Sequence, residues 1–342
     1  MASQQAWATL GPSSFSGDFP DPSVVAEGST YYAFATQYGY WDATQHRFVC
    51  GPNDADPSDP NPCRNIQRLS GPGPNGPWTV RSDGLEQMPS WADQGYTWAP
   101  SVLKIAGQWL MYYTTRQHST GQQCISVATA PTLTQTFVDR SSGPLVCQNS
   151  RGGSIDPAPF IDANGSIYLY WKSTDKVWFS TYAAIWGQQL STSGLTAIGS
   201  AQRLLVRDQA WEGSTIEGPF MVGVPPVSTT TSRYTKYDLF YSGNSWETAK
   251  YAVGYAECTG PLTGCTKVTK SGPWYSANVA GTGPNGPGGQ GFFTDSAGQL
   301  QMAYHAWAGE VGYGGPPPGG RRAMWVNPVR YNSTTHRPVP PS

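Results

Sequence analysis

The chain has 342 residues, a formal net charge of −1 and a low share of charged residues, 13%. A net charge this close to zero gives no electrostatic reason to expect nucleic acid or an anionic membrane as partner. No apolar run approaches the roughly 20 residues that are needed to cross a bilayer. The 40 glycines and 30 prolines, with 13% aromatic residues, favour short strands joined by tight turns over long helices.

Five segments of alternating or continuous apolar residues predict strands. They are TYYAFAT from Thr30, QWLMYYTT from Gln108, SIYLYWKS from Ser166, YDLFYSGN from Tyr237 and LQMAYHAW from Leu300. A shorter strand-like segment precedes each one: DPSVV at Asp21, APSVLK at Ala99, DPAPFI at Asp156, EGPFMV at Glu217 and GQGFFT at Gly289. The sequence therefore repeats one strand–turn–strand unit five times.

The units recur at intervals of about 55 to 80 residues, and each interval leaves room for two further strands. Four-stranded units arranged around a ring form a β-propeller, whereas a β-sandwich does not explain five copies of one hairpin. We predict an all-β fold, a five-bladed β-propeller. It forms a single domain over residues 1–342, with the propeller at about 12–331 and short polar tails.

The six cysteines fall into three close pairs: Cys50 with Cys63, Cys124 with Cys147, and Cys258 with Cys265. An even count without a CxxC motif or nearby histidines favours three local disulfides over a zinc site. Disulfides indicate a secreted protein, although the first residues, MASQQAWATL, do not resemble a signal peptide. We therefore expect secretion, with the signal peptide absent from this sequence; the alternative is a cytosolic protein with six free thiols.

Acidic residues stand at the start of three of the repeated hairpins, as Asp21-Pro22, Asp156-Pro157 and Glu217-Gly218-Pro219. The second hairpin has Trp98-Ala99-Pro100 at the matching place. The innermost strands of a propeller run along its axis, so these acids are expected to meet at one mouth. A residue before proline favours an extended backbone, and this restriction would hold each carboxylate still.

Such a group of acids suits glycoside hydrolysis. One carboxyl must be protonated to assist the leaving oxygen, and another must be ionised to activate water. A third acid can raise the pKa of the proton donor by like-charge repulsion. The alternative is that Asp-Pro and Glu-Gly only form turns where the strands begin.

At these positions the sequence resembles glycoside hydrolase family 43, whose members are five-bladed propellers acting on arabinan, arabinoxylan and related plant polysaccharides. The matching stretches are DFPDPSVV, YTWAPSVLK, GGSIDPAPFIDANGSIYLYW, STIEGPFM, LFYSGNSW and MAYHAW. The resemblance implies an inverting hydrolase in which Asp21 is the general base, Glu217 the general acid and Asp156 the residue that tunes the pKa of Glu217. Asp18, three residues before Asp21, is expected to be a turn or rim residue.

The resemblance also implies residues that contact the sugar or an ion. Trp98 matches an aromatic that floors the sugar pocket, and Trp41, Trp171 and Trp246 could act similarly. His305 matches a histidine near the axis that contacts substrate or, through water, a structural calcium ion; otherwise it is a hydrogen-bonded core residue. Gln290 stands where many relatives have a histidine, which puts the calcium in doubt. No cofactor is required for the chemistry.

Within the family, the stretch YSGNSWETAKYAVGYAECTGPL looks most like the α-L-arabinofuranosidases, including exo-acting ones. Endo-1,5-α-L-arabinanase and β-xylosidase activities occur on the same scaffold and stay open as alternatives. The segment from Gly51 to Pro77 is a candidate pocket wall, which favours exo action. The expected partner is an arabinose- or xylose-containing saccharide, bound by a monomer. A propeller that binds sugar without catalysis is the alternative from another class.

Overall fold

The computed structural model describes residues 13–37, 40–42, 47–49, 64–177, 180–224, 234–277, 284–313 and 320–341. These residues form strands and turns without an α-helix, and their helical content is two 3-10 turns, η1 (Asn149–Arg151) and η2 (Ala210–Glu212). In this described part of the chain, no helix has the length and apolarity that a membrane span requires.

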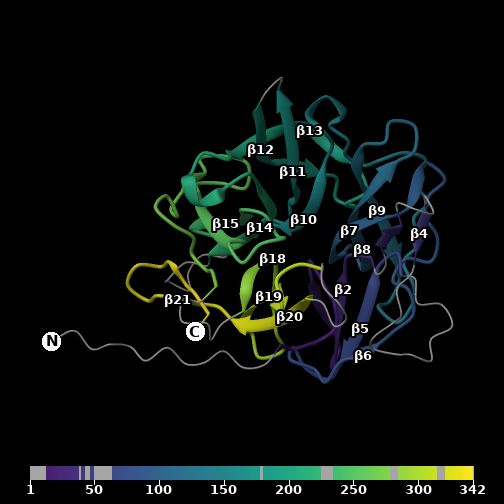
Figure 1. The fold of residues 1–342 in the computed structure, drawn as a ribbon, viewed down its shortest axis with the longest axis horizontal. Coiled ribbons are helices and arrows are strands. Elements are labelled where there is room, and N and C mark those ends of the chain that lie inside the picture. The colour runs from purple at the N-terminus through teal and green to yellow at the C-terminus, as the bar shows by residue number, and fades with distance from the viewer. Residues whose placement is uncertain are drawn as a thin grey trace.

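The strands form five sheets around a central axis, which confirms the five-bladed β-propeller (Figure 1). Blade 1 contains β1 (Ser23–Glu27), β2 (Thr30–Ala35), β5 (Gln67–Gly71) and β6 (Thr79–Val80). Blade 2 contains β7 (Ala92–Ile105), β8 (Gln108–Gln117) and β9 (Gln123–Ala130). Blade 3 contains β10 (Ile155–Ile161), β11 (Ile167–Val177), β12 (Ser180–Leu190) and β13 (Ala197–Val206).

Blade 4 contains β14 (Ile216–Val224), β15 (Lys236–Gly243), β16 (Ala252–Cys258) and β17 (Thr266–Lys267). Blade 5 contains β18 (Asn285–Thr294), β19 (Leu300–Ala308) and β20 (Arg321–Pro328). Two small hairpins lie outside the blades, β3 (Tyr40–Asp42) with β4 (Arg47–Val49), and β21 (Arg330–Tyr331) with β22 (Pro338–Val339).

Each predicted strand–turn–strand unit is the innermost hairpin of one blade. The pairs β1–β2, β7–β8, β10–β11, β14–β15 and β18–β19 are all antiparallel. The N-terminal segment closes the ring, because Phe15 and Met324 of β20 exchange backbone hydrogen bonds of 3.2 and 3.1 Å. The first described residues thus occupy the outer edge of the last blade.

Five apolar clusters fill the wedges between neighbouring blades. The wedge between blades 1 and 2 holds Phe34 and Met111, and the wedge between blades 5 and 1 holds Val24 and Met324. The other three clusters join blades 2 and 3, 3 and 4, and 4 and 5. Burial of apolar surface stabilises by about 25 cal/mol per Å², so these wedges hold the blades in a fixed orientation around the axis.

Two of the three predicted disulfides are confirmed. Cys124 is bonded to Cys147, and Cys258 is bonded to Cys265. The predicted pair Cys50–Cys63 lies outside the described residues. Both observed bridges are local in sequence, as their spacing indicated.

Candidate active site

The innermost strand of each blade contains, or closely follows, a residue with a left-handed backbone, which we call the head residue. The angle φ is +55° at Asp21, +45° at Ala99, +57° at Asp156, +55° at Gly218 and +58° at Gly289. The first four directly precede a proline. The extended backbone that we expected before these prolines is therefore wrong.

A β-bulge explains the left-handed head residues. In blades 2 to 5 the pairing between the two inner strands shifts register at this place, for example between Ile155 and Ala158. A bulge inserts one extra residue, which a left-handed conformation can accommodate. The left-handed conformation that the bulge requires outweighs the preference of a residue before proline for an extended backbone. A residue other than glycine in such a conformation costs about 1–3 kcal/mol.

Glu217 does not occupy the same place as the two aspartates. The head residue of blade 4 is Gly218, and Glu217 precedes it by one position. Its structural equivalents are Trp98 in blade 2 and Ile155 in blade 3. The prediction that three acids share one repeat position was therefore wrong by one residue. Because successive strand residues point in different directions, Glu217 enters the site from another side than Asp156.

Each head residue is tied to the preceding blade through its backbone N–H group. The acceptors are His305 Nδ1 for Asp21 at 3.0 Å, Thr36 Oγ1 for Ala99 at 2.9 Å, Thr114 Oγ1 for Asp156 at 3.0 Å, and Ser242 Oγ for Gly289 at 2.9 Å. Blade 4 differs, since Gly218 donates to Asp156 Oδ2 at 2.9 Å. These bonds connect all five heads into a ring.

Asp21 is held as an ionised carboxylate. Its Oδ2 accepts a hydrogen bond of 2.7 Å from the hydroxyl of Thr36, and its Oδ1 lies 3.3 Å from His305 Nδ1. Burial by itself would raise the pKa of Asp21, but His305, Arg322 and Thr36 together lower it to about 2. A carboxylate with this pKa is ionised at any ordinary pH, which is the protonation state that a general base needs.

Asp156 has the opposite protonation behaviour. Burial, and next the negative charge of Glu217, raise the pKa of Asp156 to about 7, although Lys172 and the Gly218 N–H group act against the increase. Asp21 adds a smaller repulsion. Two acids in one site thus have pKa values far apart, which is the arrangement that acid–base catalysis requires.

Both carboxylate oxygens of Glu217 accept a hydrogen bond from a neighbouring side chain. Lys172 Nζ lies 3.0 Å from Oε2, and the hydroxyl of Tyr251 donates to Oε1 at 2.9 Å. Neither partner was assigned a role from the sequence. Lys172 could have been noticed as the one charged residue in IYLYWKS, because a cation in such an apolar strand needs a buried acid. Tyr251 lies just before β16 and carried no comparable signal.

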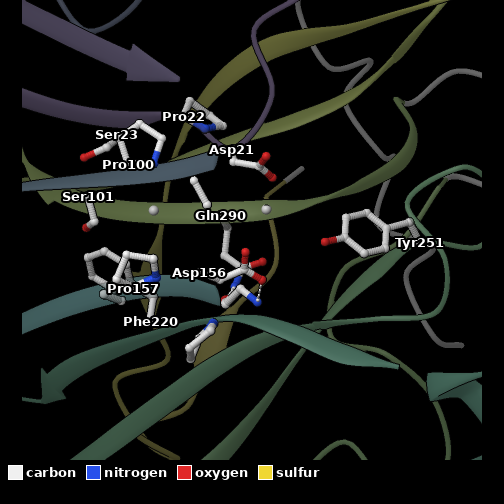
Figure 2. A pocket seen from close by; sticks show the side chains of 16 residues that line it. Asp21, Pro22, Ser23, Pro100, Ser101, Asp156, Pro157, Phe220, Tyr251 and Gln290 are labelled. Atoms are coloured by element: carbon white, nitrogen blue, oxygen red, sulfur yellow. Dashed lines mark hydrogen bonds between the residues drawn. The ribbon is translucent and has the colours of Figure 1, made fainter. Parts of the chain in front are cut away.

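One cavity of about 330 Å³ brings the three predicted acids together. It is lined by Asp21, Thr36, Trp98, Ile155, Asp156, Lys172, Glu217, Trp246 and Arg322, so all five blades contribute. Below it, an axial cavity of about 40 Å³ is bordered by the head residues and their prolines. Figure 2 shows Asp21 and Asp156 on either side of the strand that carries Gln290, with the Tyr251 hydroxyl directed toward them.

The predicted tryptophans have different outcomes. Trp98 and Trp246 line the cavity. Trp171 is completely buried in the wedge between blades 2 and 3, and its Nε1 donates to Gln148 Oε1 at 2.9 Å, so the prediction that it binds sugar is wrong. Its large ring is needed as core there. The side chain of Trp41 lies outside the described residues.

His305 takes part in the ring of hydrogen bonds that connects the head residues. It is 1% exposed, stacks on Tyr251 and does not line the large cavity, so it is not in position to contact substrate as predicted. Its Nδ1 accepts the Asp21 N–H bond at 3.0 Å. Nε2 is buried without a partner among the described residues.

This arrangement does not fit a calcium ion bound directly by His305. Calcium prefers six to eight oxygen ligands, whereas His305 offers only ring nitrogens, and a calcium ion held through water stays a prediction. Within the described residues, no group of three or more acidic, histidine or cysteine side chains could hold a metal ion. Gln290 is also engaged, since it donates to the Gly218 carbonyl at 2.7 Å and accepts from Ser242 at 2.8 Å.

Arg322 enters the cavity from blade 5. Its guanidinium lies 4.3 Å from the Trp246 ring centroid, and its Nε donates to the Tyr313 hydroxyl at 2.8 Å. Asp18 does not line the cavity; it accepts hydrogen bonds from the Arg322 backbone at 2.8 Å and from Tyr313. Asp18 therefore fastens the segment that presents Arg322.

Comparisons with known proteins agree with this geometry. A probable arabinan endo-1,5-alpha-L-arabinosidase A from Aspergillus flavus is 24% identical over 332 residues, which are 90% of this chain and 88% of that protein. The same-named protein from Aspergillus clavatus is 26% identical over 75% of this chain and 78% of its own.

Solved structures share the fold. A thermostable family-43 glycoside hydrolase aligns with a TM-score of 0.72 and 21% identity over 94% of this chain and 92% of its own. An exo-1,5-alpha-L-arabinanase from a bovine ruminal metagenomic library aligns with a TM-score of 0.68 and 18% identity over 96% and 99%. Residues 14–334 match the family described as glycosyl hydrolases family 43, so the chain belongs to that family and is a glycoside hydrolase.

Proposed function

We propose that this enzyme hydrolyses α-L-arabinofuranosidic bonds of arabinan with inversion, acting from the chain end as an α-L-arabinofuranosidase. The observation that carries the chemistry is one cavity lined by three carboxyls in unlike environments. The pKa of Asp21 is lowered to about 2, whereas that of Asp156 is raised to about 7. Carboxyls separated in this way can supply a base and an acid at the same pH.

In the proposed step, Asp21 accepts a proton from a water molecule while the water oxygen bonds to the anomeric carbon. Glu217 gives its proton to the leaving oxygen as the glycosidic bond breaks. One water is consumed, and exchange with solvent restores both carboxyls. Burial, and next the Glu217 charge, raise the pKa of Asp156 to about 7, so Asp156 holds a proton near neutral pH. We propose that Glu217 carries a proton when the leaving oxygen is bound.

Two observations support arabinan and exo action. The curated relatives are named as arabinan enzymes, and a structural neighbour is named as an exo-arabinanase. Side chains from all five blades surround the cavity, with Trp98 and Trp246 among its walls. A pocket enclosed by several walls accepts the end of a chain more readily than its middle, and tryptophan rings suit the apolar faces of sugars.

Endo action is the second candidate, because both Aspergillus relatives are named as endo-acting enzymes. β-Xylosidase activity is the third candidate function on this scaffold. Products from debranched arabinan, arabinoxylan and xylobiose, followed over time, separate the three. Arabinose alone from debranched arabinan supports exo action; early arabino-oligosaccharides would contradict it, and xylose from xylobiose would identify the xylosidase.

The acid assignment is tested with Glu217→Gln. We expect this variant to lose at least 100-fold in the hydrolysis of arabino-oligosaccharides while it keeps its fold, because the amide cannot give a proton. Glu86→Gln, an exposed glutamate away from the cavity, is the matched control and should be fully active. Full hydrolysis by Glu217→Gln would refute the mechanism and favour a chemistry or a binding role that does not need this carboxyl.

We also propose that the protein is secreted and acts as a monomer. The two disulfides support export, because such bonds persist in oxidising compartments. The proposed hydrolysis uses only protein groups and water. Light scattering of the purified enzyme at working concentration tests the monomer, and a dimeric mass would refute it.

A further inference from the structure

Lys172 breaks a pattern that the other blades follow. The second strand of each blade carries a polar residue opposite the position just before the head: Thr36, Thr114, Lys172, Ser242 and His305. In four blades this residue accepts the backbone N–H bond of the next head. An ammonium group has no acceptor, so Lys172 cannot make this bond.

In blade 4 another hydrogen bond takes the place of the one that Lys172 cannot accept. The N–H group of Gly218, the head that Lys172 would have bound, donates instead to Asp156 Oδ2. Lys172 is thereby left to face the cavity and to pair with Glu217 at 3.0 Å. Among the described residues, Glu217 accepts one of its three N–H bonds, although Lys172 is only 7% exposed. A buried cation is costly unless it is paired, so the burial of Lys172 depends on its ion pair with Glu217.

We propose that Lys172 is a positioning residue that holds the Glu217 carboxyl at the cavity wall and, through its positive charge, sets the alkaline limit of activity. This inference rests on the proposed role of Glu217 as the proton donor. The ammonium of Lys172 weakens proton binding by Asp156, so Asp156 loses its proton at a lower pH than it would beside a neutral side chain.

The surrounding charges give the sign of the effect. Two titratable groups act directly on Lys172, namely Asp156 on β10 and Glu217 on β14. The charged or titratable groups that act on the acids are Asp21 before β1, Tyr251 before β16, His305 on β19 and Arg322 on β20. Its neighbour on β12 is the apolar Ile185. Glu217 and Asp156 raise the pKa of Lys172 despite burial, so the side chain stays charged through the assay range. Removal of this charge must strengthen proton binding by the acids.

The test compares pH–rate profiles of Lys172→Met and Lys172→Arg with that of the wild type. Without the charge, we expect the alkaline limb of kcat to move up by about one pH unit, because an opposite charge at this range shifts a carboxyl pKa by 1–3. We expect kcat at its optimum to fall about tenfold, since Glu217 loses one of its two anchors. Arginine keeps the charge and should keep the wild-type alkaline limb.

Lys270→Met, at an exposed lysine, is the control and should change nothing. If Lys172→Met does not fold, Lys172→Gln removes the same charge and keeps a hydrogen bond to Glu217. An unmoved alkaline limb in a folded, uncharged variant would overturn this inference. If Glu217→Gln is inactive in that case, the proposed function stands without it; if Glu217→Gln is fully active, the proposed function fails first.

Discussion

Blades 2 and 3 begin with the same backbone turn but with different chemistry. Ala99 and Asp156 have φ values of +45° and +57°, both precede a proline, and both donate their N–H group to a threonine of the preceding blade. Only blade 3 places a carboxylate there. The left-handed turn therefore belongs to the propeller architecture, and the enzyme uses it in two blades to present an acid.

The left-handed turn shapes the site, whereas the carboxyls at two of the turns take part in the reaction. The strained backbone at Ala99 exists where no acid needs to be aimed, so strain at Asp21 and Asp156 is not in itself a sign of catalysis. What distinguishes the acidic heads is their surroundings, namely His305, Thr36 and Arg322 around Asp21 and Glu217 beside Asp156.

The largest expected effect comes from making blade 1 resemble blade 2 through Asp21→Ala. Alanine already occupies this turn at Ala99, so the variant should fold normally. Activity should drop about 1,000-fold or more, because a general base contributes roughly 10²–10⁴ and the cavity also loses an acceptor for water. Steady-state kinetics with circular dichroism measure both expectations. Activity within tenfold of the wild type would mean that Asp21 is only an architectural residue.

A smaller effect is expected from Asp156→Asn on stability. A carboxyl with a folded pKa of about 7 and an unfolded pKa near 3.9 holds a proton only in the folded state between these values, so stability falls as pH rises from about 4 to 7. The amide does not ionise, so the variant should be more stable than the wild type at pH 8. We expect a gain on the order of 2 kcal/mol, since the carboxyl keeps some contact with water.

Urea unfolding of both proteins at pH 5 and pH 8 measures this difference. The same comparison should show lower activity of Asp156→Asn at pH 8, where the ionised Asp156 of the wild type repels the Glu217 carboxylate and the amide does not. Equal stability profiles for the two proteins would show that Asp156 is not protonated near neutral pH in the folded enzyme.

The smallest expected effect is on the free energy of unfolding, from a substitution in the left-handed turn at Ala99. Ala99→Gly should stabilise the protein by about 0.5 kcal/mol, because relief of the left-handed strain exceeds the entropy cost of glycine. Ala26→Gly in β1, which has no positive φ, is the control and should destabilise by about 0.5–1 kcal/mol. Thermal and urea unfolding at one pH measure both. A destabilised Ala99→Gly would show that the turn is unstrained in the native protein.

The sequence by itself determined the fold class, the five inner hairpins and two of the disulfides. These features depend on local signals: the period-2 alternation of strands such as LQMAYHAW, turn residues between them, and paired cysteines 23 and 7 residues apart. It also identified Asp21, Asp156 and Glu217 as a group, since repeated positions in a ring converge at one end.

Only the tertiary structure decided which side chains meet at that end. The β-bulge at each head moved Glu217 one position away from the slot of the aspartates, and no sequence pattern marks a bulge. Lys172 and Arg322 reach the acids across blade boundaries that are set by ring closure and wedge packing, and Tyr251 reaches Glu217 from another part of blade 4. Trp171 could equally have been core or cavity wall until that packing buried it. Contacts of this kind depend on blade orientation, which local patterns do not encode.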